Sequence, residues 1–150
     1  EVGRRQRDEV LRPMQPKVVA VYKQCSADEY GPSVDQILEE RAKPGTYTVA
    51  PKSYRKCVTM SSTAYEPGPR SCGRYADGYT SIGLKAGYGV VAIDPDVIPY
   101  GTRLFVENYG FAVAGDTGGA INGRRIDLGF LTVRECLDWG RRKVKVYILD

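Results

Sequence analysis

The chain has 150 residues, 42% of them hydrophobic, and its 17 glycines and 9 prolines favour one globular domain of turn-rich β structure over a helical bundle. Its net charge of +4 favours polyanionic surroundings, but the chain lacks the dense basic stripe of a nucleic-acid-binding protein. The absence of histidine excludes Ser-His-Asp and Cys-His nucleophilic sites and HExxH metal centres, so acid–base catalysis falls to carboxyl groups with raised pKa values, or to Lys, Tyr or Cys.

The first third of the chain is predicted to form an arm and a linker. Residues 1–24 alternate weakly and are interrupted by prolines, which predicts an extended strand arm, the tail of an upstream β module. Residues 25–53 are predicted to be a linker with one short helix, because Ser33 and Gln36 form a capping box ahead of apolar residues at helical spacing. The run Lys43-Pro44-Gly45 ends that helix.

Residues 54–150 consist of short apolar runs separated by glycine and proline. One helix interrupts them, begun by a capping box of Thr132 and Glu135 and ended at Gly140. The runs predict six strands, over residues 55–65, 89–93, 103–106, 112–115, 124–128 and 144–149. Six strands with one small helix in so short a segment predict a compact β-barrel.

The four cysteines are Cys25, Cys57, Cys72 and Cys136, and no two form a CxxC pair, which argues against a zinc site or a thioredoxin-like motif. Four cysteines in a small basic domain are typical of a secreted protein and allow three disulfide pairings; four buried thiols in a cytosolic protein are the alternative. No run approaches the ~20 apolar residues of a membrane span. The chain opens on a charged run without a signal-peptide pattern, so we expect a mature or truncated chain whose export signal lies upstream.

Three aspartates each lie beside a predicted strand and a turn. Asp94 and Asp116 follow apolar strands, and Asp127 lies between two large apolar neighbours. The pair Asn122-Gly123 predicts a tight turn, which folds two strands together and can bring Asp116 and Asp127 to one end of a sheet. The alternative for each aspartate is a turn-capping role.

The run Asp116-Thr117-Gly118 also matches the catalytic triplet of aspartic peptidases. Those enzymes need two triplets that share one proton, so a chain with a single triplet could only act as a homodimer. The second glycine and the basic turn Asn122-Gly123-Arg124-Arg125 do not match the pattern of such enzymes. A homodimeric aspartic peptidase therefore stays as a less favoured alternative.

A series of motifs between residues 60 and 149 resembles the three-aspartate (3D) domain family, which includes the stationary-phase survival proteins of spore-forming bacteria. Through its barrel the family is similar to membrane-bound lytic transglycosylase A. The motifs, in chain order, are Thr63-Ala64-Tyr65 with Gly68, Ser71-Cys72-Gly73, Ala76-Asp77-Gly78, Gly89-Val90-Val91-Ala92-Ile93-Asp94-Pro95, Ile98-Pro99-Tyr100-Gly101-Thr102, Asp116-Thr117-Gly118-Gly119-Ala120-Ile121, Gly123-x-Arg125-Ile126-Asp127-Leu128 and Trp139-Gly140-Arg141-Arg142.

The resemblance implies a six-stranded double-psi β-barrel over residues 54–150, with one small helix in it and the arm and linker helix outside it. It implies cleavage of peptidoglycan glycan strands without water, which leaves 1,6-anhydro-N-acetylmuramic acid ends. Asp94, Asp116 and Asp127 match the three aspartates, with Asp127 as the catalytic acid. The partner is then peptidoglycan at the bacterial cell wall, outside the cytoplasm, and neither a cofactor nor a metal is implied.

Asp127 must carry a proton before it can act as an acid, whereas a free Asp titrates near ~3.9. Ile126 and Leu128 point to the opposite face of the strand, so they cannot by themselves desolvate the carboxyl group. We expect instead that Asp94 and Asp116 raise its pKa, because clustered carboxylates cannot all ionise.

Candidate substrate-binding residues come from three segments: Thr63, Tyr65, Lys85, Gly118, Gly119 and Ala120. The resemblance implies that Thr63 and Tyr65 line the cleft, although strand packing competes with sugar contact for the tyrosine. Glycines beside a carboxylate let a saccharide approach the backbone, and a turn that needs positive φ explains them equally well. Lys85 and Arg124-Arg125 are candidates for carboxylates of the peptide stems or for anionic wall polymers, with a solvated surface role as the alternative.

One departure from the family concerns cysteine. Relatives often carry a cysteine after the Asp-Leu pair, where this chain has Gly129. We therefore expect Cys72 to pair with Cys136 and Cys25 with Cys57. Since a fold does not determine a function, a non-catalytic peptidoglycan-binding double-psi barrel, as in expansin-like proteins, is the main alternative to the enzyme.

Overall fold

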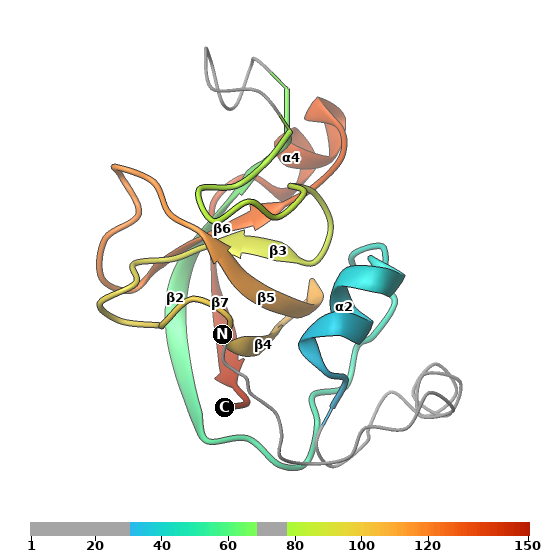
Figure 1. Cartoon of the computed structure of the whole chain (residues 1–150), viewed down its shortest axis with the longest axis vertical. Coiled ribbons are helices and arrows are strands. Elements are labelled where there is room, and N and C mark those ends of the chain that lie inside the picture. Colours follow the sequence, from blue (N-terminus) through green and yellow to red (C-terminus); the bar gives the residue numbers. More distant parts are fainter. Residues whose placement is uncertain (1–30, 69–77) are drawn as a thin grey trace.

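The computed structural model describes residues 31–68 and 78–150, and in these residues six strands close into a barrel (Figure 1). The strand order is β2-β6-β3-β5-β4-β7. The strands are β2 (Lys56–Tyr65), β3 (Val90–Ala92), β4 (Arg103–Val106), β5 (Gly110–Asp116), β6 (Arg125–Gly129) and β7 (Arg142–Ile148), and the helices are α2 (Val34–Glu40) and α4 (Val133–Trp139). The predicted fold class, a mainly β chain with a closed six-stranded barrel, is confirmed.

The barrel mixes parallel and antiparallel pairing. The pairs β2–β6 and β3–β5 are parallel, and the other four pairs are antiparallel. A parallel pair cannot be joined by a tight hairpin, so longer connections bring together strands that are far apart in the sequence. As a result β6 lies between β2 and β3, and each of these three strands contributes to the site described below.

The strand β2 shows why the barrel has an inner and an outer face. Met60 and Ser62 are buried, whereas Thr59 is exposed and Ser61 and Thr63 are partly exposed, as expected when alternate side chains face the core and solvent. Burying each large aliphatic side chain stabilises the fold by about 1.5–3 kcal/mol. The most deeply buried side chains of the core are Met60, Ile93, Ile98, Leu104, Ile126, Leu128, Val91, Val106 and Val144.

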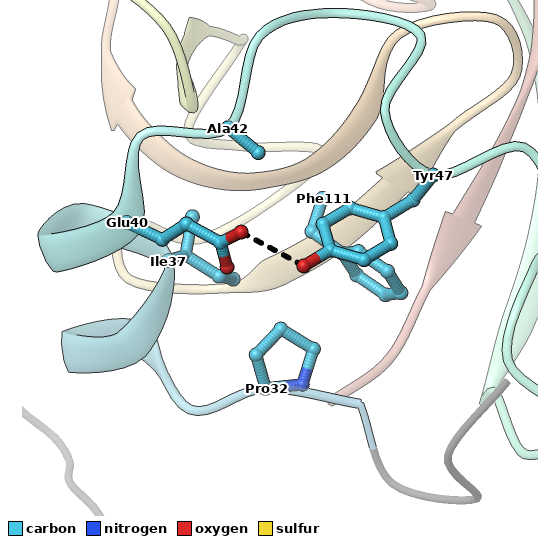
Figure 2. A pocket seen from close by; sticks show the side chains of 6 residues that line it. All are labelled: Pro32, Ile37, Glu40, Ala42, Tyr47 and Phe111. Carbon is cyan, nitrogen blue, oxygen red and sulfur yellow. Dashed lines mark hydrogen bonds between the residues drawn. The ribbon is translucent and has the colours of Figure 1, made fainter. Parts of the chain in front are cut away.

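The segment predicted to be a linker packs on the outer face of β4 and β5. A second apolar cluster joins it to the barrel, formed by Ile37, Tyr47, Phe105, Phe111 and Val113. The Tyr47 ring meets the Phe111 ring edge-on at 5.5 Å, and the Tyr47 hydroxyl donates to Glu40 Oε2 at 2.8 Å across a small recess (Figure 2). The domain boundary at residue 54 stays a prediction, but residues 32–50 are in contact with the barrel.

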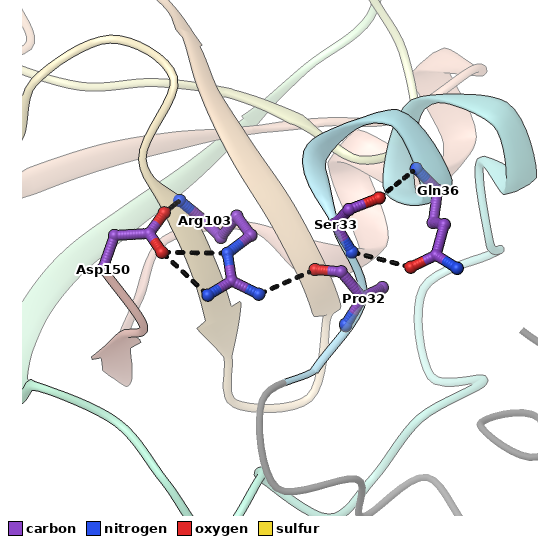
Figure 3. A network of polar contacts seen from close by, with 5 residues as sticks. All are labelled: Pro32, Ser33, Gln36, Arg103 and Asp150. Carbon is purple, nitrogen blue, oxygen red and sulfur yellow. Dashed lines mark hydrogen bonds and ion pairs between the residues drawn. The ribbon is translucent and has the colours of Figure 1, made fainter. Parts of the chain in front are cut away.

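Arg103 of β4 ties this segment to Asp150 (Figure 3). Its Nε and Nη2 atoms donate to Asp150 Oδ1 at 3.0 and 2.7 Å, and its backbone N–H donates to Oδ2 at 3.0 Å. Its Nη1 donates to the carbonyl oxygen of Pro32 at 2.9 Å. Because Arg103 is only 5% exposed, its charge needs these partners, and the network fixes the start of α2 against the barrel.

Both predicted capping boxes are present. Ser33 and Gln36 exchange side-chain and backbone hydrogen bonds of 2.8 and 3.1 Å at the start of α2 (Figure 3). Thr132 and Glu135 do the same at the start of α4, and α4 is followed by Gly140. The indole N–H of Trp139, the last residue of α4, donates to the buried Ser62 hydroxyl at 3.0 Å, which fixes α4 to β2.

The described cysteines do not form the expected disulfides. Cys57 is an exposed free thiol and Cys136 is a partly buried free thiol. Their expected partners, Cys25 and Cys72, lie outside the described residues, as does the arm predicted for residues 1–24. Within residues 31–68 and 78–150, the helices are too short to cross a membrane.

Candidate active site

Asp127 lies in a row of paired residues that crosses four strands on the outer face of the barrel. In the strand register Asp127 pairs with Thr63 of β2 on one side and with Ala92 of β3 on the other, and Ala92 also pairs with Asp116 of β5. The small side chain of Ala92 therefore separates the two carboxylates. Their backbones are two strand spacings apart, about 10 Å.

A β-bulge brings Asp116 into this row. Val91 pairs with Ala114 but Ala92 pairs with Asp116, so β5 has one extra residue, Gly115, at that point. A Cβ atom on Gly115 would lie 2.7 Å from Leu84 Cδ1, so a larger residue would not fit there without rearrangement. The glycine allows the bulge to pack, and the bulge turns Asp116 toward the face that carries Asp127.

The environment of Asp127 favours the protonated form of its carboxyl group more than water does. Burial raises the pKa of its carboxyl group above the ordinary value; a hydrogen bond from Thr63 lowers it, the charge of Asp116 raises it, and Arg125 lowers it. The Thr63 hydroxyl donates to Asp127 Oδ1 at 2.9 Å. The net pKa shift is upward, and Asp116 contributes to it, as predicted; burial nevertheless contributes most, and Asp94 is not among the causes.

The reason for this difference lies in the register. Ile126 and Leu128 face the core, as predicted. Asp127 is flanked across the sheet by Thr63 and Ala92, and this pairing cannot be seen from the residues next to Asp127 in the sequence. The Thr63 hydroxyl contacts the carboxyl group directly, whereas Asp116 pairs with Ala92, a further strand away. Burial therefore outweighs repulsion between charges at this site.

Asp116 is the last residue of β5 and holds a neighbouring turn. Its Oδ1 atom accepts the N–H of Ser81 at 3.0 Å and the N–H of Thr117 at 2.8 Å. The turn that contains Ser81 is closed by the hydrogen bond from the Thr80 N–H to the Leu84 carbonyl oxygen at 2.7 Å. Asp116 thus raises the pKa of Asp127 through its negative charge, and it also holds the turn at residues 80–84 beside the row.

Asp94 behaves as a turn cap, the alternative raised for each aspartate. Its Oδ1 accepts the N–H of Asp96 at 2.9 Å, and its Oδ2 accepts the N–H of Gly123 at 2.8 Å. The bond from Gly123, followed by that from Asp96, lowers the pKa of the Asp94 carboxyl group, so this carboxylate stays ionised. Asp94 therefore joins the turn after β3 to the loop that precedes β6.

The predicted substrate-binding residues differ in their contacts and in their exposure. Thr63 contacts Asp127 directly. Tyr65 is only 7% exposed, and its hydroxyl donates to the Val90 carbonyl oxygen at 3.1 Å, so it packs in the barrel wall rather than presenting its ring for stacking. Lys85 is exposed on the hairpin that it closes with Tyr79, the same hairpin that Asp116 holds.

The loop after β5 carries the remaining candidates. Gly119 and Ala120 are exposed and Gly118 is partly exposed. Neither Gly118 nor Gly119 has a positive φ, whereas Gly123, in the predicted Asn-Gly turn, has φ of 66°. A requirement for positive φ therefore explains Gly123 but not the two glycines next to Asp116, and around Gly119 the space is open.

Sequence reasoning missed two neighbours of the site. Glu66 follows directly after β2 and is only 7% exposed, and the N–H of Gly68 donates to its Oε2 at 2.6 Å. Burial and the nearby charges of Glu66, Asp127 and Glu135 raise the pKa of the Cys136 thiol to about 11. The position of Glu66 after an alternating strand was the available signal, but only the fold shows that it turns toward α4.

The glycine at position 129, where relatives often carry a cysteine, has a steric explanation. A Cβ atom at this position would clash with the carbonyl oxygen of Gly87 and lie 2.5 Å from that of Val90. The backbone entering β3 crosses directly over β6 here, so no side chain fits. In the described part of the chain, no three acidic or cysteine side chains are grouped closely enough to hold a metal ion.

Comparisons with known proteins confirm the resemblance seen in the motifs. Residues 89–150 match the model of the 3D domain family. The chain is 40% identical over 103 residues to YabE of Bacillus subtilis (strain 168), a protein named for cell wall shaping, and 36% identical over 99 residues to the cell wall-binding protein YocH of the same organism. These matches cover 66% and 63% of this chain but only 24% and 33% of the relatives.

Among solved structures, the chain is similar to MltA from E. coli, with 25% identity and a TM-score of 0.42 over 47% of this chain and 26% of that one. It is also similar to the Streptomyces papain inhibitor, with 19% identity and a TM-score of 0.44 over 65% of this chain and 97% of that one.

Proposed function

We propose that this chain, whose residues 89–150 match the 3D domain family, acts on the bacterial cell wall as a peptidoglycan lytic transglycosylase. The observation that carries the proposal is the partly buried Asp127 with its raised pKa, paired with Thr63 on the outer face of the barrel. The names of YabE and YocH, which refer to cell wall shaping and cell wall binding, support an extracytoplasmic location at the wall.

The first step needs one acid. Protonated Asp127 donates its proton to the glycosidic oxygen between N-acetylmuramic acid and N-acetylglucosamine, and the bond from that oxygen to the anomeric carbon breaks. A raised pKa keeps this proton available at higher pH than an ordinary aspartate would allow. Positive charge develops on the sugar ring, next to the carboxylate that Asp127 has become.

The second step uses the sugar's own hydroxyl group in place of water. The C6 hydroxyl oxygen of the muramic acid attacks its anomeric carbon, and the Asp127 carboxylate accepts the hydroxyl proton. The products are a 1,6-anhydro-muramic acid end and a free N-acetylglucosamine end, and Asp127 is protonated again. A single aspartate serves both steps, which suits a chain without histidine.

Asp127 is a better acid than the other two aspartates for reasons of environment. The Asp94 carboxylate accepts two backbone N–H groups that lower its pKa, so it holds no proton to donate. Asp116 accepts two backbone N–H groups on one oxygen and acts on Asp127 through its charge. We assign Asp116 and Asp94 to positioning, the first through the turn at residues 80–84 and the second through the loop before β6.

The test is a digest of purified insoluble peptidoglycan with mass spectrometry of the released sugar ends. The wild type is expected to release muropeptides that are lighter by one water than hydrolysis products, and Asp127→Asn is expected to lower their rate of release by about 10²- to 10⁴-fold. Asp138→Asn is the matched control, since it makes the same chemical change on the exposed face of α4 and should leave the rate unchanged. Undiminished anhydro products from Asp127→Asn would refute the assignment.

A non-catalytic wall-binding module is the second candidate, and the name of YocH favours it. The same digest separates the two functions: co-sedimentation with peptidoglycan and no product from the wild type would support binding alone. The homodimeric peptidase receives no support from the family match and predicts cleaved peptides instead of cleaved glycan.

A further inference from the structure

A second row of residues lies beside the row of Asp127 on the outer face of β6, β2 and β7. In the strand register Ser61 pairs with Arg125 of β6 on one side and with Lys143 of β7 on the other. These pairs lie two positions along the strands from the pair Thr63–Asp127, a distance of about 7 Å. Because partners in register project from the same face, Arg125 and Lys143 flank Ser61 on the outside of the barrel.

Arg125 and Lys143, here called the basic pair, have no ion-pair partner among residues 31–68 and 78–150. Lys143 is exposed and Arg125 is partly exposed. Lys145, two residues further along β7, donates its backbone N–H to Glu107 Oε1 at 3.0 Å, so a carboxylate lies beside that residue. The positive charge of Arg125 reaches the site, because it lowers the pKa of Asp127.

The charge around Asp127 changes sign from one side to the other. Arg125 lies on β6, two residues before Asp127, and Lys143 lies on β7, whereas the Asp116 carboxylate lies at the end of β5, on the other side of β6. A substrate with one anionic branch is bound more favourably with that branch over the basic pair than over the Asp116 carboxylate. The surface therefore distinguishes the two orientations of a branched glycan.

We propose that the basic pair binds carboxylates of the peptide stem carried by the muramic acid whose glycosidic bond lies at Asp127. This inference rests on the proposed function and specifies its substrate: glycan strands that still bear stems. The stem leaves the same sugar that reacts, so its carboxylates lie a short branch away from the bond, which suits a separation of about 7 Å between the two rows. The sugar rings themselves carry no charge that would need two cations.

Binding is measured by isothermal titration calorimetry with full chains that carry Asp127→Asn, so that no ligand is cleaved. The probes are three soluble tetrasaccharides: a muropeptide with its stems intact, the same muropeptide with its stem carboxylates converted to amides, and an uncharged, stem-free N-acetylglucosamine tetramer. The double variant Arg125→Gln/Lys143→Gln is compared with Lys43→Gln/Lys52→Gln, which removes two exposed positive charges from the segment outside the barrel.

The loss of the basic pair is expected to weaken binding of the intact-stem ligand about five- to tenfold at low salt, and less at high salt. Binding of the amidated ligand and of the stem-free ligand should not change, and the control double variant should bind all three as the parent does. Equal weakening for all three ligands, or no weakening for the first, would overturn the proposal.

The proposed lytic activity is tested separately, by the sugar ends that the wild type releases from peptidoglycan. Charge-selective binding by the basic pair without anhydro ends would support stem recognition and refute cleavage. Anhydro ends from a protein whose binding does not depend on the stem carboxylates would support cleavage and refute stem recognition.

Discussion

Burial raises the pKa of Asp127, and two neighbouring residues change that pKa further. The Thr63 hydroxyl stabilises the carboxylate through a hydrogen bond of 2.9 Å, and Asp116 destabilises it through its negative charge. The two neighbours therefore act on the pKa of Asp127 in opposite directions. Changing each one alone gives two predictions of opposite sign on one measurement.

Activity that needs a protonated acid falls as the pH rises through the pKa of that acid. Thr63→Val removes the bond that lowers the pKa of Asp127, so the alkaline limb of the kcat/KM profile should move to higher pH. Asp116→Asn removes the charge that raises the pKa but keeps an acceptor for the Ser81 and Thr117 N–H groups, so the limb should move to lower pH. Shifts in the same direction would contradict this account, and Asp138→Asn should cause none.

A raised pKa also links Asp127 to stability. The folded chain binds this proton more tightly than the unfolded chain does, so ionisation of Asp127 costs folding free energy as the pH rises through its folded pKa. Asp127→Asn removes that cost. Its melting temperature should exceed that of the wild type at neutral pH, and the difference should vanish at a pH below both the folded and the unfolded pKa. Scanning calorimetry across pH measures this; a variant less stable at neutral pH would mean that the carboxylate is well solvated.

At the scale of elements, the crossing of β3 over β6 leaves no room for a side chain at Gly129. Gly129→Ala should lower the free energy of unfolding by about 3 kcal/mol or more, because the added Cβ atom meets backbone oxygens that cannot move aside. Gly119→Ala is the matched control: no atom lies within 4 Å of its added Cβ and its φ is not positive, so the change should stay within about 0.5 kcal/mol. Urea unfolding of both variants measures the contrast.

The elements themselves could be predicted from the sequence to within a few residues. The strand predicted over 55–65 is Lys56–Tyr65, and the strand predicted over 103–106 is Arg103–Val106, because alternating and β-branched runs between turn residues are local signals. Both helices begin at their predicted capping boxes. Local signals also located Asn122-Gly123, where Gly123 has the positive φ of a tight turn.

What the sequence did not reveal depends on contacts between distant segments. The bulge at Gly115 decides that Asp116, and not its neighbour, stands opposite Ala92, and no local pattern marks it. The hydrogen bond to Asp127 comes from Thr63 across the sheet, 64 positions away in the chain. The ring of Tyr65 faces the barrel wall because its hydroxyl finds the Val90 carbonyl oxygen, which strand alternation alone cannot show.

At the scale of the whole molecule, the barrel makes extensive contacts with residues that precede position 54. Phe105, Phe111 and Val113 are at most 7% exposed, and residues from the segment 32–50 pack against them on the outer face of β4 and β5. Arg103, 5% exposed, reaches from β4 to both Pro32 and Asp150. The segment predicted as a linker thus completes an apolar layer and a charged network of the barrel.

A chain that begins at residue 54 should therefore be much less stable than one that begins at residue 31. Exposing large apolar side chains costs about 1.5–3 kcal/mol each, so uncovering Phe105, Phe111 and Val113 removes several kcal/mol, a large part of the ~5–15 kcal/mol that stabilises a typical domain. The shorter chain should bind a hydrophobic dye and unfold at lower urea concentration. Equal unfolding midpoints for the two chains would mean that residues 31–53 rest on the barrel without stabilising it, and the boundary at residue 54 would then mark an independently stable domain.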